Sequence, residues 1–258
     1  MSQFVLALIM GSFIGAAAGY LGTLMLSKRM VLVAGPLGHL TLPGIALAFL
    51  FGFDVSLGAF MAVSLGIILI WLLEIKTKLP MEALTAIVFA TGVAITFLFL
   101  PEEKTIPALI GDISQISPII VTITVILSLS VIFVIKKIYK KIVLAEISED
   151  IAKSEGINVK KYNFIYLFCI AIVVSLGAKV VGGLMTAALV AIPACTSKNL
   201  SKNIFQYCLG GLFFGGLSCL IGIILFKFTN IPAGPLIVLS SAFFFLISLI
   251  FSAKGGKR

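Results

Sequence analysis

Long apolar runs without charge alternate with short charged clusters along this chain. A helix needs about 20 apolar residues to cross a hydrocarbon core about 30 Å thick. Nine runs approach or reach that length, at residues 4–26, 31–53, 55–73, 83–100, 118–135, 162–178, 180–197, 204–226 and 235–253. The pattern predicts an all-α, polytopic membrane helical bundle of eight or nine spans, since such helices offer water no polar face.

Composition supports a single membrane domain over residues 1–258. Hydrophobic residues make up 60% of the chain and charged residues 11%, with a mean hydropathy of +1.23. Soluble proteins have roughly a quarter charged residues. The net charge of +9 does not indicate nucleic-acid binding, because the basic residues lie beside apolar runs, where they orient a membrane protein.

The basic residues also predict the orientation. With the N-terminus outside and every run crossing the membrane, 16 of the 19 Lys and Arg residues fall on the cytoplasmic side. The outside segments keep three of them, Lys104, Lys179 and Lys227. Positive residues are enriched in cytoplasmic loops. We therefore expect a multi-pass cell-membrane protein with its N-terminus outside and its C-terminus in the cytoplasm.

The longest cytoplasmic connection, about residues 136–161, contains the signals of a short helix. Ser148 is a suitable N-cap, and Glu149 and Asp150 would lie at the positive end of the helix dipole. Gly156 suits the left-handed residue that closes a helix. Ile147 and Ile151 would share one face, four residues apart. The segment is either a solvated loop with one helical turn or a docking element for a cytoplasmic partner.

Two of the apolar runs contain helix breakers. The second run holds Pro43 and the only histidine, His39, and a helix continuing through Pro43 would leave the His39 carbonyl without an amide partner. The seventh run also contains helix breakers, Gly182-Gly183 and Pro193. Paired interruptions in two parts of a transporter indicate a substrate path. Ionisable side chains within the membrane are rare and mark such paths, although an isolated histidine can also be a helix-packing contact.

No catalytic constellation is present in the sequence. It contains no GxxxxGK[ST] phosphate loop, no HExxH and no histidine other than His39, and the nine runs contain no carboxylate. We expect a transport subunit that is not itself an enzyme and that holds no resident cofactor. The driving force would come from another subunit.

Several segments resemble the zinc/manganese-type ABC importer permeases. Residues 30–44, MVLVAGPLGHLTLPG, resemble the family's M-x-L-x-G-D-A-L-S-H-A-x-L-P-G block. Residues 183–194, GLMTAALVAIPA, resemble its G-L-L-x-x-A-L-L-x-x-P-A block, and residues 231–239, IPAGPLIVL, its P-x-G-x-x-I-V-L block. Residues 150–156 are similar to its acidic-x-Ala-x-x-x-Gly pattern. The blocks follow the family's order and span nearly the whole chain.

The resemblance implies a type II importer permease that imports Zn, Mn or Fe by alternating access. Two permease copies, most simply a homodimer, would form the pore, and an extracytoplasmic metal-binding protein would deliver the ion. A cytoplasmic ABC ATPase would dock on the short helix, with coupling residues Ser148, Glu149, Asp150, Ile151, Ala152 and Gly156. The path residues would be His39, Gly35, Pro43, Met185 and Pro193.

One departure from the family concerns the cargo. Aligned on His39, the family's Asp falls at Gly35 and its Ser at Gly38. A partner subunit or backbone carbonyls around Pro36 and Pro43 could compensate for the missing carboxylate, or the substrate differs. The alternatives are an ABC permease for a chelated or non-metal substrate, and a secondary carrier, which the lack of carboxylates in the runs disfavours.

Overall fold

Helices are the only regular elements in the described part of this computed structural model, which covers residues 2–77, 79–99, 109, 116–183, 185–229 and 231–253. A 3₁₀ turn, η1 (Val31–Val33), precedes the second helix. The helices are α1 (Gln3–Ser27), α2 (Ala34–His39), α3 (Thr41–Phe51), α4 (Val55–Thr77), α5 (Met81–Phe99), α7 (Pro118–Ile147), α8 (Glu149–Ser154), α9 (Val159–Val180), α10 (Thr186–Leu200), α11 (Ile204–Thr229) and α12 (Ala233–Ala253).

The predicted membrane helical bundle is confirmed. In the described residues, seven segments are long and apolar enough to cross a membrane, with α2 and α3 together forming one of them. The apolar stretch of α5 is shorter, at Ala83–Leu98. The seventh apolar run yields α10, whose 15 residues extend about 22 Å. That length falls short of a full crossing.

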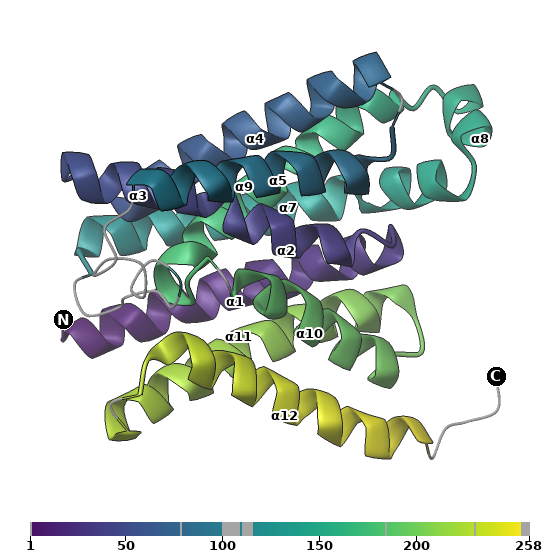
Figure 1. Cartoon of the computed structure of the whole chain (residues 1–258). Helices are drawn as coiled ribbons and strands as arrows, with labels where there is room; N and C mark the ends of the chain where they lie inside the picture. Colours follow the sequence, from purple (N-terminus) through teal and green to yellow (C-terminus); the bar gives the residue numbers. More distant parts are fainter. Residues whose placement is uncertain are drawn as a thin grey trace.

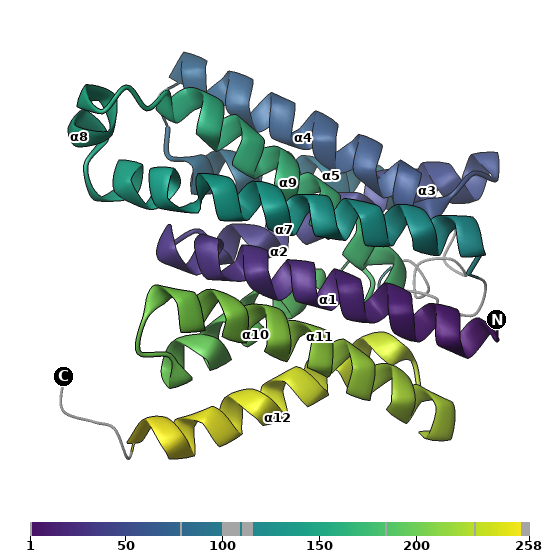
Figure 2. The same ribbon diagram turned by 180° about the vertical axis from the view of Figure 1, so that it is seen from behind.

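Helix α1 lies at the centre of the bundle (Figures 1 and 2). Helices α3, α4, α5, α7 and α9 lie on one side of it, and α10, α11 and α12 on the other. Close packing of α1 on α11 depends on glycine. A Cβ on Gly15 would stand 2.9 Å from the Gly215 carbonyl carbon, and a Cβ on Gly19 would stand 2.9 Å from the Gly211 carbonyl carbon. Small residues let membrane helices approach closely, so this pair forms the core.

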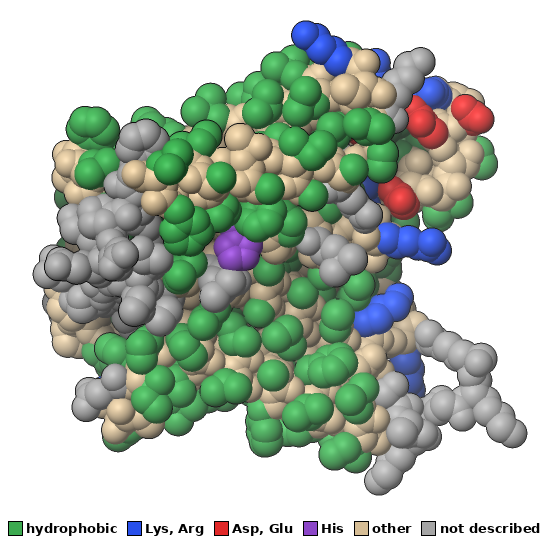
Figure 3. Space-filling model, viewed as in Figure 1, with side chains coloured by type: hydrophobic (Ala, Val, Ile, Leu, Met, Phe, Trp, Pro, Cys, Tyr) green, Lys and Arg blue, Asp and Glu red, His purple; other side chains and the backbone are tan. Residues whose placement is uncertain are grey.

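Charged side chains gather at one end of the molecule. Figure 3 shows Lys, Arg, Asp and Glu side chains at the end where Figure 1 places α8, and the N-terminus lies at the opposite end. Lys78, Lys104, Lys254, Lys257 and Arg258, which entered the sequence count, lie outside the described residues. Lys179, expected in an outside loop, belongs to α9.

The connection predicted at residues 136–161 is more helical than expected. Helix α7 continues to Ile147, so the first twelve residues of this connection, 136–147, are helical. Ser148 is extended, with φ −156° and ψ 113°, and separates α7 from α8. Because Ile147 ends one helix and Ile151 lies in the next, the prediction that they share one helix face is wrong.

Candidate functional site

The first interruption lies between α2 and α3. Helix α2 ends at His39, and α3 begins at Thr41 after a turn at Leu40. Pro36 and Pro43 are each the third residue of their helix, where an amide hydrogen has no intrahelical acceptor. No helix runs through Pro43 from His39, so the break precedes the proline. The Thr41 hydroxyl donates to the Gly38 carbonyl at 2.6 Å.

The second interruption lies between α9 and α10, at the Gly182-Gly183 pair singled out in the sequence. Helix α9 ends at Val180, and Gly182 has a φ of +88°, a conformation that L side chains rarely adopt. The Thr186 hydroxyl, at the start of α10, donates to the Gly182 carbonyl at 2.7 Å. A glycine turn therefore divides this part of the chain into two helices.

The two interruptions contact each other through their backbones. A Cβ on Gly38 would stand 2.6 Å from the Gly183 carbonyl oxygen, and a Cβ on Gly183 would stand 2.7 Å from the Thr41 hydroxyl. A side chain at Gly38 would clash with backbone, and one at Gly183 would have to displace the Thr41 hydroxyl. The structure thus brings together the two broken segments that the sequence predicted separately.

His39 lies beside this contact and is half-buried. Its ring packs against Phe89 of α5, with the centroids 5.1 Å apart. A Cβ on Gly92 of α5 would stand 3.1 Å from Leu40 and 3.6 Å from Pro43, so α5 covers one side of the interruption. Figure 3 shows the imidazole at the middle of an open face of the molecule. The ring is therefore accessible to an ion from that face.

The other predicted path residues have different surroundings. Gly35 is half-buried, and a Cβ there would meet no atom within 4 Å. Met185 is half-buried and precedes α10, whereas Pro193 is buried about two turns inside that helix. Within the described residues, no three His, Cys, Asp or Glu side chains form a group that could hold a metal ion.

At the other end of the bundle, α8 has the predicted local structure. The Ser148 hydroxyl accepts from the Ile151 amide at 3.3 Å, and Gly156 has a φ of +72°. The Gly156 amide donates to the Lys153 carbonyl and the Ile157 amide to the Ala152 carbonyl, which closes the helix in a Schellman motif. Ala152 is fully buried, while Ile151 is 51% exposed and Ile147 76% exposed. Helix α8 is therefore anchored through Ala152 and exposes the apolar side chain of Ile151, next to that of Ile147 at the end of α7.

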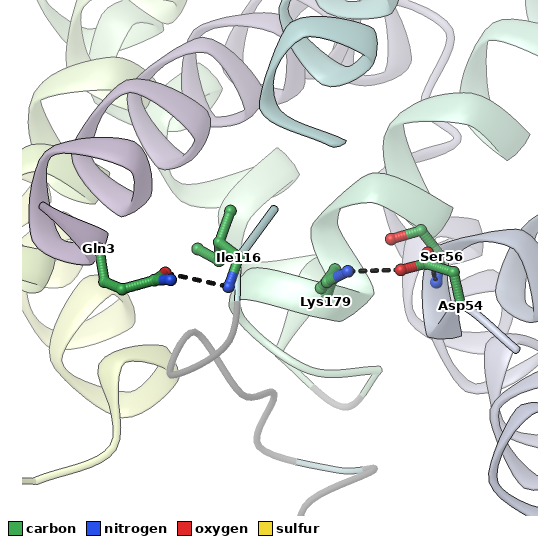
Figure 4. A network of polar contacts seen from close by, with 5 residues as sticks. All are labelled: Gln3, Asp54, Ser56, Ile116 and Lys179. Atoms are coloured by element: carbon green, nitrogen blue, oxygen red, sulfur yellow. Dashed lines mark hydrogen bonds and ion pairs between the residues drawn. The ribbon is translucent and has the colours of Figure 1, made fainter. Parts of the chain in front are cut away.

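An ion pair that the sequence analysis missed lies at the N-terminal end of the bundle (Figure 4). Lys179 Nζ donates to Asp54 Oδ2 at 2.6 Å, and the Ser56 amide donates to Asp54 Oδ1 at 2.9 Å. At the same end, the Ile116 amide donates to Gln3 Oε1 at 3.2 Å. The ion pair joins the α3–α4 connection to the end of α9, just before the glycine turn.

Removing the Asp54 charge is expected to destabilise the protein. Burial raises the pKa of this carboxyl, but the hydrogen bond and charge of Lys179, with two backbone amides, outweigh burial and hold the pKa below its ordinary 3.8. The pair therefore stabilises the fold fully above that ordinary value, and the contribution is lost as pH falls through the lower folded-state pKa. Asp54→Asn leaves the Lys179 ammonium, only 10% exposed, without a counter-charge and should cost about 1–3 kcal/mol.

Thermal melting of the purified chain at pH 7 and at pH 3 measures this effect. The wild type should have a higher melting temperature than Asp54→Asn at pH 7, and the difference between the two melting temperatures should be smaller at pH 3. The double variant Asp54→Asn/Lys179→Met is the control and should recover part of the loss, because no unpaired charge remains. Equal melting of wild type and Asp54→Asn at pH 7 would contradict a stabilising ion pair.

Comparison with known proteins gives a consistent result. The model of the ABC 3 transport family matches residues 1–252. The manganese import system permease protein ScaB of Streptococcus parasanguinis is 27% identical over 256 residues, covering 98% of this chain and 91% of that protein. The high-affinity zinc uptake system membrane protein ZnuB of Buchnera aphidicola is 26% identical, covering 95% and 96%. The solved structure of PsaBC from Streptococcus pneumoniae in complex with Fab superposes with a TM-score of 0.83 at 24% identity, covering 96% of this chain and 91% of that chain.

Proposed function

The chain belongs to the ABC 3 transport family, and on that premise we propose that it is the membrane permease of an ATP-driven importer for a transition-metal dication such as manganese or zinc. Relatives that it matches over nearly their whole length are named for manganese import and zinc uptake. The observation that carries the proposal is the position of His39, on an open face beside the contact of two interrupted helices. Family membership disfavours a secondary carrier.

The ion would pass along the face that presents His39. Neutral imidazole is a suitable ligand for zinc, manganese and iron. A second copy of this chain, related by two-fold symmetry, would present the same surface and bring a second His39 to the path. Two imidazoles would bind an ion weakly enough to release it. Gly35, Pro43, Met185 and Pro193 are the other proposed path residues.

The cargo enters as substrate, and no resident cofactor is required. The space beside Gly35, where the resembling family has Asp, leaves room for a larger cargo. A chelated metal is therefore the second candidate. Transport of manganese, zinc and iron salts, compared with the same metals as chelates, separates the two.

The two ends of the bundle suggest where the ATPase and the metal-binding protein of the importer would bind. We place the N-terminus outside and the α8 end in the cytoplasm, because the basic residues gather at the α8 end. A separate ABC ATPase would bind at α8, and an extracytoplasmic metal-binding protein would deliver the ion at the opposite end. The chain itself would contribute the pore and no ATP hydrolysis.

His39→Ala tests the proposed path. Loss of the imidazole should lower metal uptake at least about tenfold, the effect typical of disturbing a metal-binding site, while membrane insertion and melting stay as in the wild type. The measurement is radioactive manganese or zinc uptake into proteoliposomes that contain the permease and its ATPase. Phe89→Leu is the matched control, since it removes the ring contact and keeps the imidazole. Wild-type uptake by His39→Ala would remove His39 from the path.

A further inference from the structure

Helix α9 and the turn after it contact the segment that leads into the proposed path at two places. Near the start of α9, Asn163 Oδ1 accepts a hydrogen bond from Lys28 Nζ at 2.9 Å. In the turn after α9, Gly183 lies against Gly38, where an added Cβ would stand 2.6 Å from the Gly183 carbonyl oxygen. Residues 29–37, which include η1 and most of α2, lie between these two contacts along the chain. The segment that positions the imidazole is therefore held at both of its ends.

The start of α9 is also joined closely to α8, where we propose that the ATPase binds. Four residues, 155–158, separate the two helices. The last of them, Asn158, caps α9 with its side chain, which accepts from the Lys161 amide at 3.0 Å. Figure 2 shows α8 at the end of the bundle where α1 finishes and α9 begins. A displacement of α8 would therefore move the start of α9, where Asn163 lies.

Lys28 is held by neutral groups of α9. Besides the Asn163 oxygen, its ammonium lies over the ring of the fully buried Tyr166, 5.0 Å from the ring centroid. Lys28 forms no ion pair with a carboxylate among the described residues. Burial lowers the pKa of Lys28, and the charges of Glu146 and Glu74 raise it by less. Leaving a half-buried ammonium without its hydrogen bond is costly, so Lys28 should follow Asn163 when α9 moves.

The turn after Lys28 is fixed by backbone hydrogen bonds. The Arg29 amide donates to the Leu26 carbonyl at 3.2 Å. The Met30 amide donates to the Met25 carbonyl at 2.9 Å. With Arg29 at a φ of +58°, these bonds close α1 in a Schellman motif, and η1 follows directly. Because no loop separates α1 from η1, a displacement at Lys28 would reach η1 and α2.

We propose that Lys28 is a positioning residue, which passes movement of α8 to the segment that holds His39 through its hydrogen bond with Asn163. The inference rests on the proposed function, since it requires the ATPase to bind at α8 and the ion to pass His39. When the ATPase displaces α8, α9 carries its contacts with Lys28 and Gly38 together, and η1 and α2 move between them. Energetic coupling between two sites typically changes an equilibrium about 5- to 150-fold.

The number of metal ions transported per ATP hydrolysed tests this coupling. Manganese uptake and phosphate release are measured in the same proteoliposomes, which contain the assembled importer. In Lys28→Met and in Asn163→Leu the ratio should fall at least about fivefold, while the ATPase still binds within about twofold of wild type, because α8 is unchanged. The double variant should show no larger fall than either single variant, since both remove the same bond. A wild-type ratio in both single variants would overturn the proposal.

A second hydrogen bond at the same end supplies matched controls. Lys141 Nζ of α7 donates to the Tyr162 hydroxyl of α9 at 2.6 Å, and this bond does not involve α1. Lys141→Met and Tyr162→Phe should therefore keep the wild-type ratio. Asn163→Asp keeps an acceptor oxygen for Lys28 and should also keep it, which a packing role alone would not require. Loss of coupling in Asn163→Asp, or an equal fall in Tyr162→Phe, would overturn the role of Lys28.

Folding and transport are measured separately from coupling. Melting temperatures show whether each variant folds. If Lys28→Met does not fold, Asn163→Leu and Asn163→Asp decide the test, because both keep the Lys28 side chain. A wild-type importer that takes up no metal would contradict the proposed function. Uptake by the wild type with unchanged ratios in the variants would contradict only this inference.

Discussion

Gly38→Ala should destabilise the permease by about 1–3 kcal/mol and stop metal uptake. The added methyl would stand 2.6 Å from the Gly183 carbonyl oxygen, a backbone atom that cannot rotate away. The two interrupted segments would have to separate, and His39 would move with α2. The melting temperature of the purified chain and uptake in proteoliposomes measure the two effects.

Gly35→Ala provides the control within the same short helix. A Cβ at Gly35 meets no atom within 4 Å, and alanine favours a helix over glycine by about 1 kcal/mol. This variant should melt at or above the wild-type temperature. A stable, transporting Gly38→Ala, or a Gly35→Ala that is as damaged as Gly38→Ala, would show that the backbone contact is not required.

Gly35 and Gly38 therefore differ in whether packing requires glycine at that position. The resemblance places a family Asp at the first position and a family Ser at the second. Packing requires glycine at position 38, because a side chain there would clash with the Gly183 carbonyl oxygen. Packing does not require glycine at position 35. Packing around the Cβ position therefore does not explain why this chain has glycine where the resembling family has Asp.

Local signals in the sequence predicted α8 well. Ser148, the acidic pair after it and Gly156 act within a few residues of one another, and each has its expected role in the structure. The position of Ile147 could not be predicted from local signals, because it depends on where α7 ends. The apolar run ends at residue 135, and its end does not mark the end of α7, since charged residues form helices as well as apolar residues do.

The interruption near His39 lies in the segment where the sequence places several helix breakers, and the break itself is at Leu40. Proline disrupts the interior of a helix, and Pro43 was interpreted in that way. In the structure Pro43 lies in the first turn of α3, where a missing amide hydrogen costs nothing. The contact between Gly38 and Gly183 depends on how distant segments pack, which periodicity does not report.

The Asp54–Lys179 pair was missed for a similar reason. Both residues lie at boundaries between apolar runs, and the sequence analysis assigned Lys179 to an outside segment and did not consider Asp54. A usable signal existed, because Asp54 is the only acidic residue in the first 73 positions and Lys179 separates two runs at the same predicted end. Opposite charges that are isolated at one end of a bundle are candidates for pairing.

Ile151→Asp should uncouple the permease from its ATPase. We propose that α8 is the docking element, and Ile151 presents an apolar side chain that is 51% exposed, beside the buried anchor Ala152. Burying a carboxylate in an interface costs several kcal/mol, and loss of a central apolar contact alone costs about 2 kcal/mol or more. Binding of the ATPase should therefore weaken at least about 30-fold, and metal uptake should fall with it. Titration of the ATPase onto the permease in nanodiscs measures the affinity.

Lys153→Gln separates docking from a general loss of charge at this end. The Lys153–Glu149 ion pair has an N–O distance of 2.9 Å, and both side chains are about 60% exposed. An exposed pair four residues apart in a helix contributes about 0.3–0.5 kcal/mol, so the variant should bind the ATPase within about threefold of wild type. If Ile151→Asp also binds like wild type while α8 stays folded, the ATPase docks elsewhere. In that case the exposed face of α8 would have no part in coupling, although the assignment of the chain as a permease would be unaffected.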